Sequence, residues 1–166
     1  MNSFPKSERF PFWILKYCSK EKNVLFNLIL DDNKLIGMEY IIKYGNVAYL
    51  MYLAIDEKQR DKGYGSKALE DLIKKHQTII LSIERPNKDL NNNSETRKKF
   101  YLRNGFFETN KFIEDNGIEY EILCTNKYYD ITKEDLEKRY TKMTSSTIIK
   151  YFIGKIFNVH NIYFIK

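Results

Sequence analysis

Cysteine, proline and glycine are scarce in this chain, and each shortage excludes a class of protein. The 166 residues include 2 cysteines, 3 prolines and 7 glycines. Cys18 and Cys124 lie far apart, with no CxxC or Cys/His cluster beside them, so we expect neither a metal site nor a disulfide framework. So little proline and glycine excludes a collagen-like chain and a Pro/Gly-rich disordered one. The fold must rest on apolar burial, for which 43% hydrophobic residues are available.

Long apolar runs are missing as well. No run reaches the roughly 18 residues that a membrane-spanning helix needs. The segment 1–9 carries charges and a proline where a secretory signal peptide would be apolar. We therefore expect a cytoplasmic protein without a membrane partner. The length suits one domain, acting as a monomer or a homodimer.

Positive charge is in excess, with a net charge of +6 and a pI of about 9.1. Most of the surplus lies in residues 126–166, which contain eight Lys/Arg and four Asp/Glu. The high pI is therefore a poor argument for nucleic acid, and no nucleic-acid partner is expected. The positive charge that matters more is local, at residues 58–67.

Hydrophobic patterning predicts the order of the elements. Helical spacing of apolar residues indicates a short helix within 7–19. Three strand-like segments separated by turn residues follow, at 24–30, 35–44 and 47–55, and predict an antiparallel meander. A helix with one apolar face and a strand at 78–83 come next, which together imply a parallel pair with a right-handed crossover.

The second half of the chain predicts a helix and a hairpin. Ser94 is a plausible N-cap for a helix that Asn104-Gly105 would end. Strands at 106–113 and 118–125 flank Asp115-Asn116-Gly117, a strong hairpin signal. We expect residues 1–125 to form the core and residues 126–166 to add an extension packed on the same domain, with one charged helix at 132–143 and an aromatic, β-branched end.

Residues 53–66 place a strand end, a basic loop and a helix start in immediate succession. The first N–H groups of a helix have no partner within it, and the helix N-terminus is positive, so such a junction binds anions. Gly63 and Gly65 lack the Cβ atoms that would keep a diphosphate from the backbone. An ordinary glycine-containing turn is the alternative.

A Rossmann fold is a second alternative, because Gly63-x-Gly65-x-x-Ala68 with Glu84 about 20 residues on fits the dinucleotide fingerprint. Residues 56–62, however, separate the strand from Gly63, whereas a Rossmann unit has its first glycine almost directly after the strand. The preceding strands form a meander, and no further βαβ unit follows. We do not expect this fold.

Two sequence motifs stand out within this predicted order of elements. They are Arg60-x-x-Gly63-x-Gly65 after the strand YLMYLAID, and Phe100-Tyr101-Leu102-Arg103-Asn104-Gly105-Phe106. Together they resemble the acetyl-CoA-binding core of the GNAT N-acetyltransferase superfamily over about residues 8–125. The resemblance implies an α/β GNAT fold, with a mixed, mostly antiparallel central sheet, a βαβ cofactor-binding unit and flanking helices.

The same resemblance implies acetyl-CoA as the cofactor. Its pantetheine arm would pair like an extra strand with Leu53, Ala54 and Ile55, which is β-augmentation. Its pyrophosphate would lie on the backbone amides of Arg60, Asp61, Lys62, Gly63, Tyr64, Gly65 and Ser66.

Acetyl transfer needs an unprotonated amine, a stabilised oxyanion and a proton for the departing thiolate. A backbone N–H of Ala54 or Ile55 could donate to the thioester oxygen. Tyr101 matches the family's tyrosine near the sulfur and is the candidate general acid; the alternative is an aromatic residue of the core. Glu84 matches a position where several members carry a general base; the alternative is a solvated carboxylate paired with Arg85. Glu39 and Glu8 could also line the acceptor side.

The sequence therefore predicts an acetyltransferase acting on a primary amine of a small molecule or a protein. The family often has an asparagine seven residues before the tyrosine, where this chain has Ser94, and the loop from Glu84 to Ser94 is longer than in compact members. Acceptor contacts in that loop cannot be carried over. A non-catalytic module that binds CoA, or nucleic acid through its basic tail, is the alternative.

Overall fold

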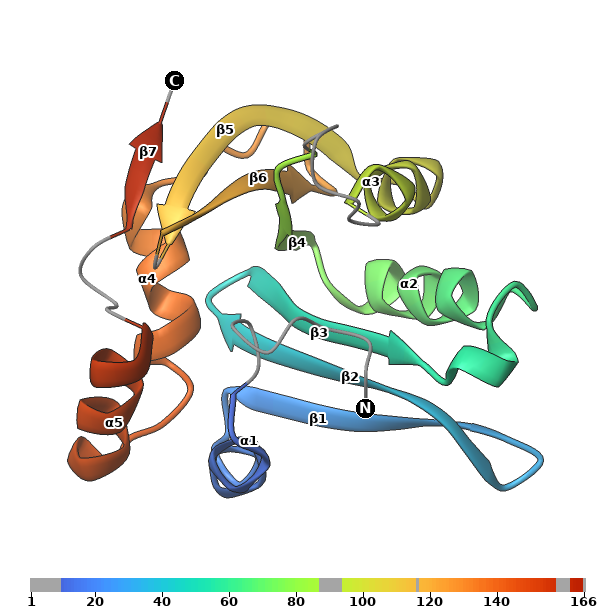
Figure 1. Ribbon diagram of the computed structural model, residues 1–166, viewed down its shortest axis with the longest axis horizontal. Coiled ribbons are helices and arrows are strands. Elements are labelled where there is room, and N and C mark those ends of the chain that lie inside the picture. Colours follow the sequence, from blue (N-terminus) through green and yellow to red (C-terminus); the bar gives the residue numbers. More distant parts are fainter. Residues whose placement is uncertain (1–9, 87–93, 116, 158–161, 166) are drawn as a thin grey trace.

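The computed structural model describes residues 10–86, 94–115, 117–157 and 162–165. Figure 1 shows a sheet with helices on both faces. In chain order the elements are α1 (Phe12–Cys18), β1 (Val24–Asp31), β2 (Lys34–Tyr44), β3 (Val47–Ile55), the 3₁₀ helix η2 (Glu57–Gln59), α2 (Tyr64–Lys75), β4 (Thr78–Glu84), α3 (Ser94–Arg103), β5 (Phe107–Asp115), β6 (Ile118–Cys124), α4 (Lys133–Thr141), α5 (Thr147–Phe157) and β7 (Tyr163–Ile165).

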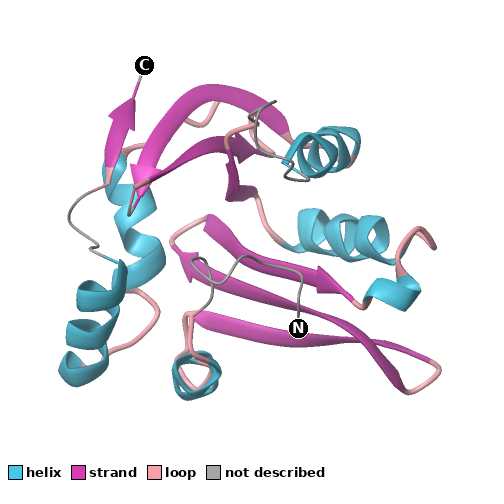
Figure 2. Ribbon diagram, in the orientation of Figure 1, coloured by secondary structure: helices cyan, strands magenta, loops and turns pink. Residues whose placement is uncertain are grey.

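The strands form a seven-stranded sheet in the order β1-β2-β3-β4-β6-β5-β7 (Figure 2). Neighbouring strands are antiparallel, except that β3 and β4 are parallel and are joined by α2. The first hairpin turns at Asp32 and Asn33, both with positive φ, as a tight two-residue turn requires. The predicted α/β fold, with its mostly antiparallel sheet and βαβ unit, is confirmed.

Each face of the sheet has its own core. On one face, side chains of α1, α4 and α5 pack against alternate strand residues such as Tyr40, Tyr49 and Ile80. On the other face, α2 and α3 cover a second cluster that includes Ile41, Leu50 and Leu81. We call these the α4 face and the α2 face. Residues after position 125 contribute to the α4 face, so the tail belongs to the same core.

The parallel pair β3–β4 is short. It joins three residues of each strand, from Val47↔Thr78 to Tyr49↔Ile80, although β3 continues to Ile55 and β4 to Glu84. A bulge follows directly on β3, because Tyr40 pairs with Tyr52 and Ile41 with Leu50, which leaves Met51 as the extra residue. The two strands therefore separate after Tyr49, and Figure 1 shows β4 turning away from β3. We call the point of separation the apex.

The end of the chain differs from the sequence-based expectation. The helix at 132–143 is present as α4, with a capping box formed by Thr132 and Asp135. The aromatic end, however, forms the helix α5 and the short strand β7, which pairs with β5. Ile149 and Ile153 of α5 are buried in the α4 face, and this packing outweighs the β propensity of the segment. Among the described residues, no helix is long and apolar enough to cross a membrane.

Candidate functional site

The loop after β3 enters α2 through two residues with positive φ. The Asp56 carboxylate accepts a hydrogen bond from the Lys58 backbone N–H at 2.9 Å and so caps η2. The chain then turns at Asp61 (φ 61°) and at Gly63 (φ 81°), the N-cap of α2. The Gly63 N-cap has no side chain to bond the first-turn N–H groups of α2. The amides of residues 64–66 stand in the first turn of α2, where backbone N–H groups have no acceptor within the helix.

The two glycines of this loop serve different purposes. Gly63 is needed for its backbone conformation, since a Cβ at this position would have no heavy atom within 4 Å. Gly65 is needed for packing, because a Cβ would lie 3.0 Å from Cζ of Phe100 and 3.7 Å from Cγ1 of Ile55. The interpretation that both glycines make room for a diphosphate is therefore wrong for Gly65, whose space the Phe100 ring occupies.

This difference predicts opposite behaviour in double variants. Gly65→Ala should destabilise the protein by roughly 1–3 kcal/mol because the Phe100 ring must move, and Phe100→Leu should restore part of the loss by vacating that space. Gly63→Ala should cost roughly 1 kcal/mol through its left-handed backbone, and Phe100→Leu should not relieve it. Urea unfolding of the single and double variants measures how strongly each glycine substitution is coupled to Phe100→Leu in the free energy of unfolding. Equal rescue of the two glycine variants would contradict this assignment.

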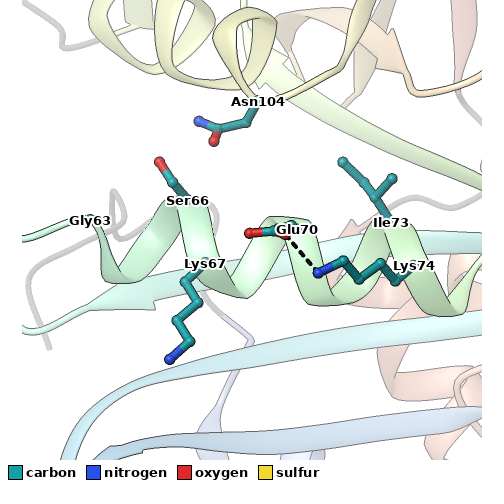
Figure 3. Close-up of a pocket in the computed structure, with 7 residues that line it drawn as sticks. All are labelled: Gly63, Ser66, Lys67, Glu70, Ile73, Lys74 and Asn104. Atoms are coloured by element: carbon teal, nitrogen blue, oxygen red, sulfur yellow. Dashed lines mark hydrogen bonds and ion pairs between the residues drawn. The ribbon is translucent and has the colours of Figure 1, made fainter.

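A groove runs along α2 from its N-terminus (Figure 3). It has a volume of about 680 Å³ and is lined by Gly63, Ser66, Lys67, Glu70, Ile73, Lys74 and Asn104. Lys74 is paired with Glu70 at 2.6 Å, and Asn104, from the end of α3, donates to the Phe100 carbonyl at 2.7 Å. Gly63 and Ser66 were predicted from the sequence. Lys67 was expected as part of the local positive charge. The sequence analysis did not single out Glu70, Ile73, Lys74 or Asn104 for this site, and the order of elements alone does not place the end of α3 beside α2.

The edge of β3 beyond the apex presents backbone groups to the gap between the strands. The Asp56 N–H donates to the Ile36 carbonyl at 2.7 Å, so the backbone of Asp56 faces β2. Antiparallel pairing alternates, which turns the peptide groups of Ala54 toward β2 and those of Leu53 and Ile55 away from it. Of the three predicted residues, Leu53 and Ile55 can pair with a ligand strand. The same alternation favours Ile55 over Ala54 as an oxyanion donor.

Tyr101 lies on the α2 face, partly buried in its core. Its ring packs edge-on between Phe100 at 5.2 Å and Phe106 at 5.5 Å. Burial raises the pKa of Tyr101 to about 12, although the charge of Arg97 acts in the opposite direction. Tyr101 is thus a packed core aromatic that also keeps its proton at neutral pH, as a general acid must.

Glu84 pairs with an arginine that the sequence analysis did not single out. Arg97 donates to Oε2 of Glu84 at 2.9 Å, and both side chains are largely shielded from solvent. The expected alternative partner, Arg85, binds Glu119 instead, also at 2.9 Å. The alternative in which Glu84 is a solvated carboxylate paired with Arg85 is therefore wrong. Arg97 lies one helical turn before Tyr101 and links the two candidate catalytic residues.

Five polar residues form a buried network at the apex, on the α4 face. Arg139 of α4 donates to the Asp115 carboxylate and, through its other terminal nitrogen, to the Tyr49 hydroxyl at 2.6 Å and the Ser82 hydroxyl at 3.2 Å. Tyr140 also donates to Asp115, at 2.7 Å. Arg139 is 4% exposed and Asp115 6%. We call this set the apex network; the sequence analysis missed it entirely.

The other candidates lie elsewhere or have a structural role. Tyr64 donates its hydroxyl to Asp31 at 2.5 Å, so its side chain is tied to the β1–β2 turn. Glu39 accepts a hydrogen bond from Asn27 at 2.7 Å and shares the α2 face with Ile41, whereas Glu8 lies outside the described residues. Cys124 is buried, and burial raises the pKa of its thiol, which suits a packing role rather than a nucleophile.

Comparisons with known proteins agree with this geometry. Solved structures share the fold: a GNAT-family protein from Bacteroides thetaiotaomicron (24% identity, TM-score 0.63, covering 94% of this chain and 85% of that one) and the ribosomal-protein-S18-alanine N-acetyltransferase from Escherichia coli (16%, 0.58, 78% and 86%). A GNAT acetyltransferase from Elizabethkingia anophelis with acetyl-CoA bound also matches (18%, 0.52, 76% and 94%). No curated protein matches. The family model of the acetyltransferase (GNAT) domain matches residues 22–108, more than half of the chain, and the protein therefore belongs to the GNAT acetyltransferases.

Proposed function

We propose that the protein transfers the acetyl group of acetyl-CoA to a primary amine by direct attack within a ternary complex. The observation that carries the proposal is the separation of β3 from β4 after Tyr49↔Ile80. It leaves a backbone edge that can pair with an extended ligand, and this edge leads directly to the open N-terminus of α2. An amide-rich arm and a diphosphate would fit this succession of sites.

The chain offers distinct groups to each part of acetyl-CoA. The amides of residues 63–66 would hold the pyrophosphate, with the basic loop 58–62 beside them. Gly63 leaves the approach open, since no heavy atom lies within 4 Å of the position of a Cβ there. The outward-facing groups of Leu53 and Ile55 would pair with the pantetheine arm. The groove along α2 adds Lys67 in the first turns of the helix, next to the proposed pyrophosphate site.

The reaction can then be assigned to side chains. Bound acetyl-CoA supplies a thioester, whose C–S bond breaks as the new C–N bond forms, while the amine loses a proton and the CoA thiolate gains one. Tyr101, protonated at neutral pH, would give the thiolate its proton. Glu84 uses Oε2 for Arg97, which leaves Oε1 to accept the amine proton directly or through water.

Ser66→Glu tests the pyrophosphate position. A carboxylate in the first turn of α2 would repel the diphosphate, so calorimetry should show the affinity for CoA falling about tenfold or more. Gln77→Glu makes the same charge change on an exposed residue just beyond the far end of α2 and should leave the affinity within about twofold. Equal effects of the two variants would remove the proposed site.

An amine panel with acetyl-CoA and a thiol reagent tests the transfer itself. Thiol release that depends on an amine, together with mass spectrometry of the acetylated product, supports the proposal. CoA binding without thiol release from any amine would instead support the alternative of a non-catalytic CoA-binding module.

A further inference from the structure

The apex network leaves one hydroxyl proton without an acceptor. Tyr49 Oη and Ser82 Oγ lie 2.6 Å apart, and Arg139 donates to both. A single proton occupies the bond between the two hydroxyls, so either Tyr49 or Ser82 keeps a second proton. Within the described residues, that proton has no partner. Tyr49 is 3% exposed, whereas Ser82 is only partly buried, so the free proton belongs on Ser82, at the open side.

This arrangement makes Ser82 a strengthened donor. Arg139 donates to Tyr49, Tyr49 donates to Ser82, and Ser82 is left to donate outward, which is a chain whose members polarise one another. The guanidinium at its buried end is compensated by Asp115 and held in place by three hydrogen bonds. A donor with a buried cation behind it favours a carbonyl or carboxylate oxygen and disfavours an ammonium group.

Ser82 lies on the face of the sheet opposite the proposed pyrophosphate site. It follows Ile80 by two residues on β4, so it shares the α4 face with Ile80 and Tyr49, whereas α2 and Tyr101 lie on the other face. The acetyl acceptor must reach the gap without displacing the cofactor. The α4 face is therefore the acceptor's side, and Ser82 is the polar group at its apex.

The α4 face continues beyond its core with partly buried apolar and aromatic side chains. They are Phe26 of β1, Met38 of β2, Met51 of β3 and Tyr120 of β6, the strand that pairs with β4. Four carboxylates of β4, β5 and β6 are paired with cations, in the pairs Glu84–Arg97, Glu119–Arg85, Glu121–Lys98 and Asp115–Arg139, and the Asp135 carboxylate of α4 accepts hydrogen bonds from Tyr129 and Thr132. A polycationic acceptor would find few uncompensated acids there, whereas an acceptor with an apolar side chain and a carbonyl oxygen would fit.

Given the acetyl transfer proposed above, we propose that the acceptor is an α-amino carbonyl compound, and that Ser82 donates a hydrogen bond to its carbonyl or carboxylate oxygen. The amine to be acetylated is then separated by two carbons, Cα and the carbonyl carbon, from an oxygen anchored at the apex. Glu84, two residues after Ser82 at the end of β4, is the neighbouring carboxylate for the amine, and its pair with Arg97 of α3 holds it at the strand end. Tyr49 and Arg139 are positioning residues that act through Ser82.

Three acceptors that share one side chain test the proposal: leucinamide, leucine, and isopentylamine, which lacks the carbonyl. For Ser82→Ala, kcat/KM should fall about tenfold, the worth of one hydrogen bond, with leucinamide or leucine, and by less than about twofold with isopentylamine. Because each acceptor is compared with itself across variants, differences in amine pKa cancel. The better of leucinamide and leucine distinguishes a peptide-like carbonyl from a free carboxylate. Ser82→Thr, which keeps the hydroxyl, should retain the wild-type preference for leucinamide over isopentylamine. Tyr49→Phe should lower that preference.

Equal losses of kcat/KM with all three acceptors, or no loss with any, would overturn the proposal. So would a Ser82→Ala variant that keeps the full preference for leucinamide over isopentylamine. Binding of leucinamide to the protein loaded with CoA, measured by calorimetry, gives a readout in which no transfer can occur. A weaker affinity in Ser82→Ala supports the subsite even if no amine releases thiol, so failure of the proposed function and failure of this inference remain distinguishable. Wild-type affinity in that variant would overturn the subsite.

Discussion

Tyr101→Phe is expected to lower kcat about 100-fold or more while the affinity for acetyl-CoA changes by less than about twofold. The substitution removes only the hydroxyl, and the ring stays between Phe100 and Phe106. Without a proton donor, the thiolate must leave unprotonated or take its proton from water. Binding is spared because the proposed contacts to the cofactor come from β3 and the start of α2.

The raised pKa of Tyr101 also sets an expectation for the pH dependence of kcat. The folded pKa of Tyr101, about 12, lies above the ordinary value of 10.0, so the acid form persists through pH 10. The wild-type kcat should therefore not fall between pH 8 and 10 through loss of this proton. Tyr128→Phe, at a tyrosine that is 84% exposed, is the matched control and should leave kcat unchanged. Unchanged turnover in Tyr101→Phe would remove Tyr101 as the acid.

The sequence predicted those parts of the fold whose signals are local. Alternating apolar residues and short turns were enough for the β1–β3 meander, and the loop before α2 was recognisable as a helix N-terminus. The segment α5 was missed because its aromatic and β-branched residues favour a strand in isolation. Only the contacts of Ile149 and Ile153 with the α4 face select a helix.

For the candidate site, too, the sequence predicted residues in local motifs and missed residues that only long-range contacts bring together. Gly63 and Tyr101 stand in motifs that a single segment carries, and the structure gives them a conformation and an environment that suit their predicted roles. Arg97 was missed because its partner Glu84 lies across a polar loop. The apex network joins residues up to 90 positions apart, such as Arg139 and Tyr49. Only the packing of α4 against the sheet brings them together.

The largest effect on stability is expected at Asp115. Asp115→Ala leaves Arg139, 4% exposed, without its carboxylate, and breaking a buried pair in this way costs about 3–5 kcal/mol. Asp115→Asn, which keeps an acceptor oxygen, should cost less. Glu119→Ala breaks the exposed Arg85–Glu119 pair and should cost less than about 1 kcal/mol. Urea unfolding compares the three variants, and equal losses in Asp115→Ala and Glu119→Ala would show that Arg139 is hydrated rather than buried.

A double substitution separates the stability of the apex network from its proposed role in selectivity. Asp115→Leu with Arg139→Met replaces both charges by apolar groups, so most of the stability lost in Asp115→Ala should return, because no unpaired buried charge remains. Ser82 would keep its hydroxyl but lose the cation behind it. If the network exists to make Ser82 a strong donor, this variant should unfold near the wild-type midpoint and yet lose the preference for leucinamide over isopentylamine. A variant that regains both stability and preference would reduce Arg139 and Asp115 to a packing element of the α4 face.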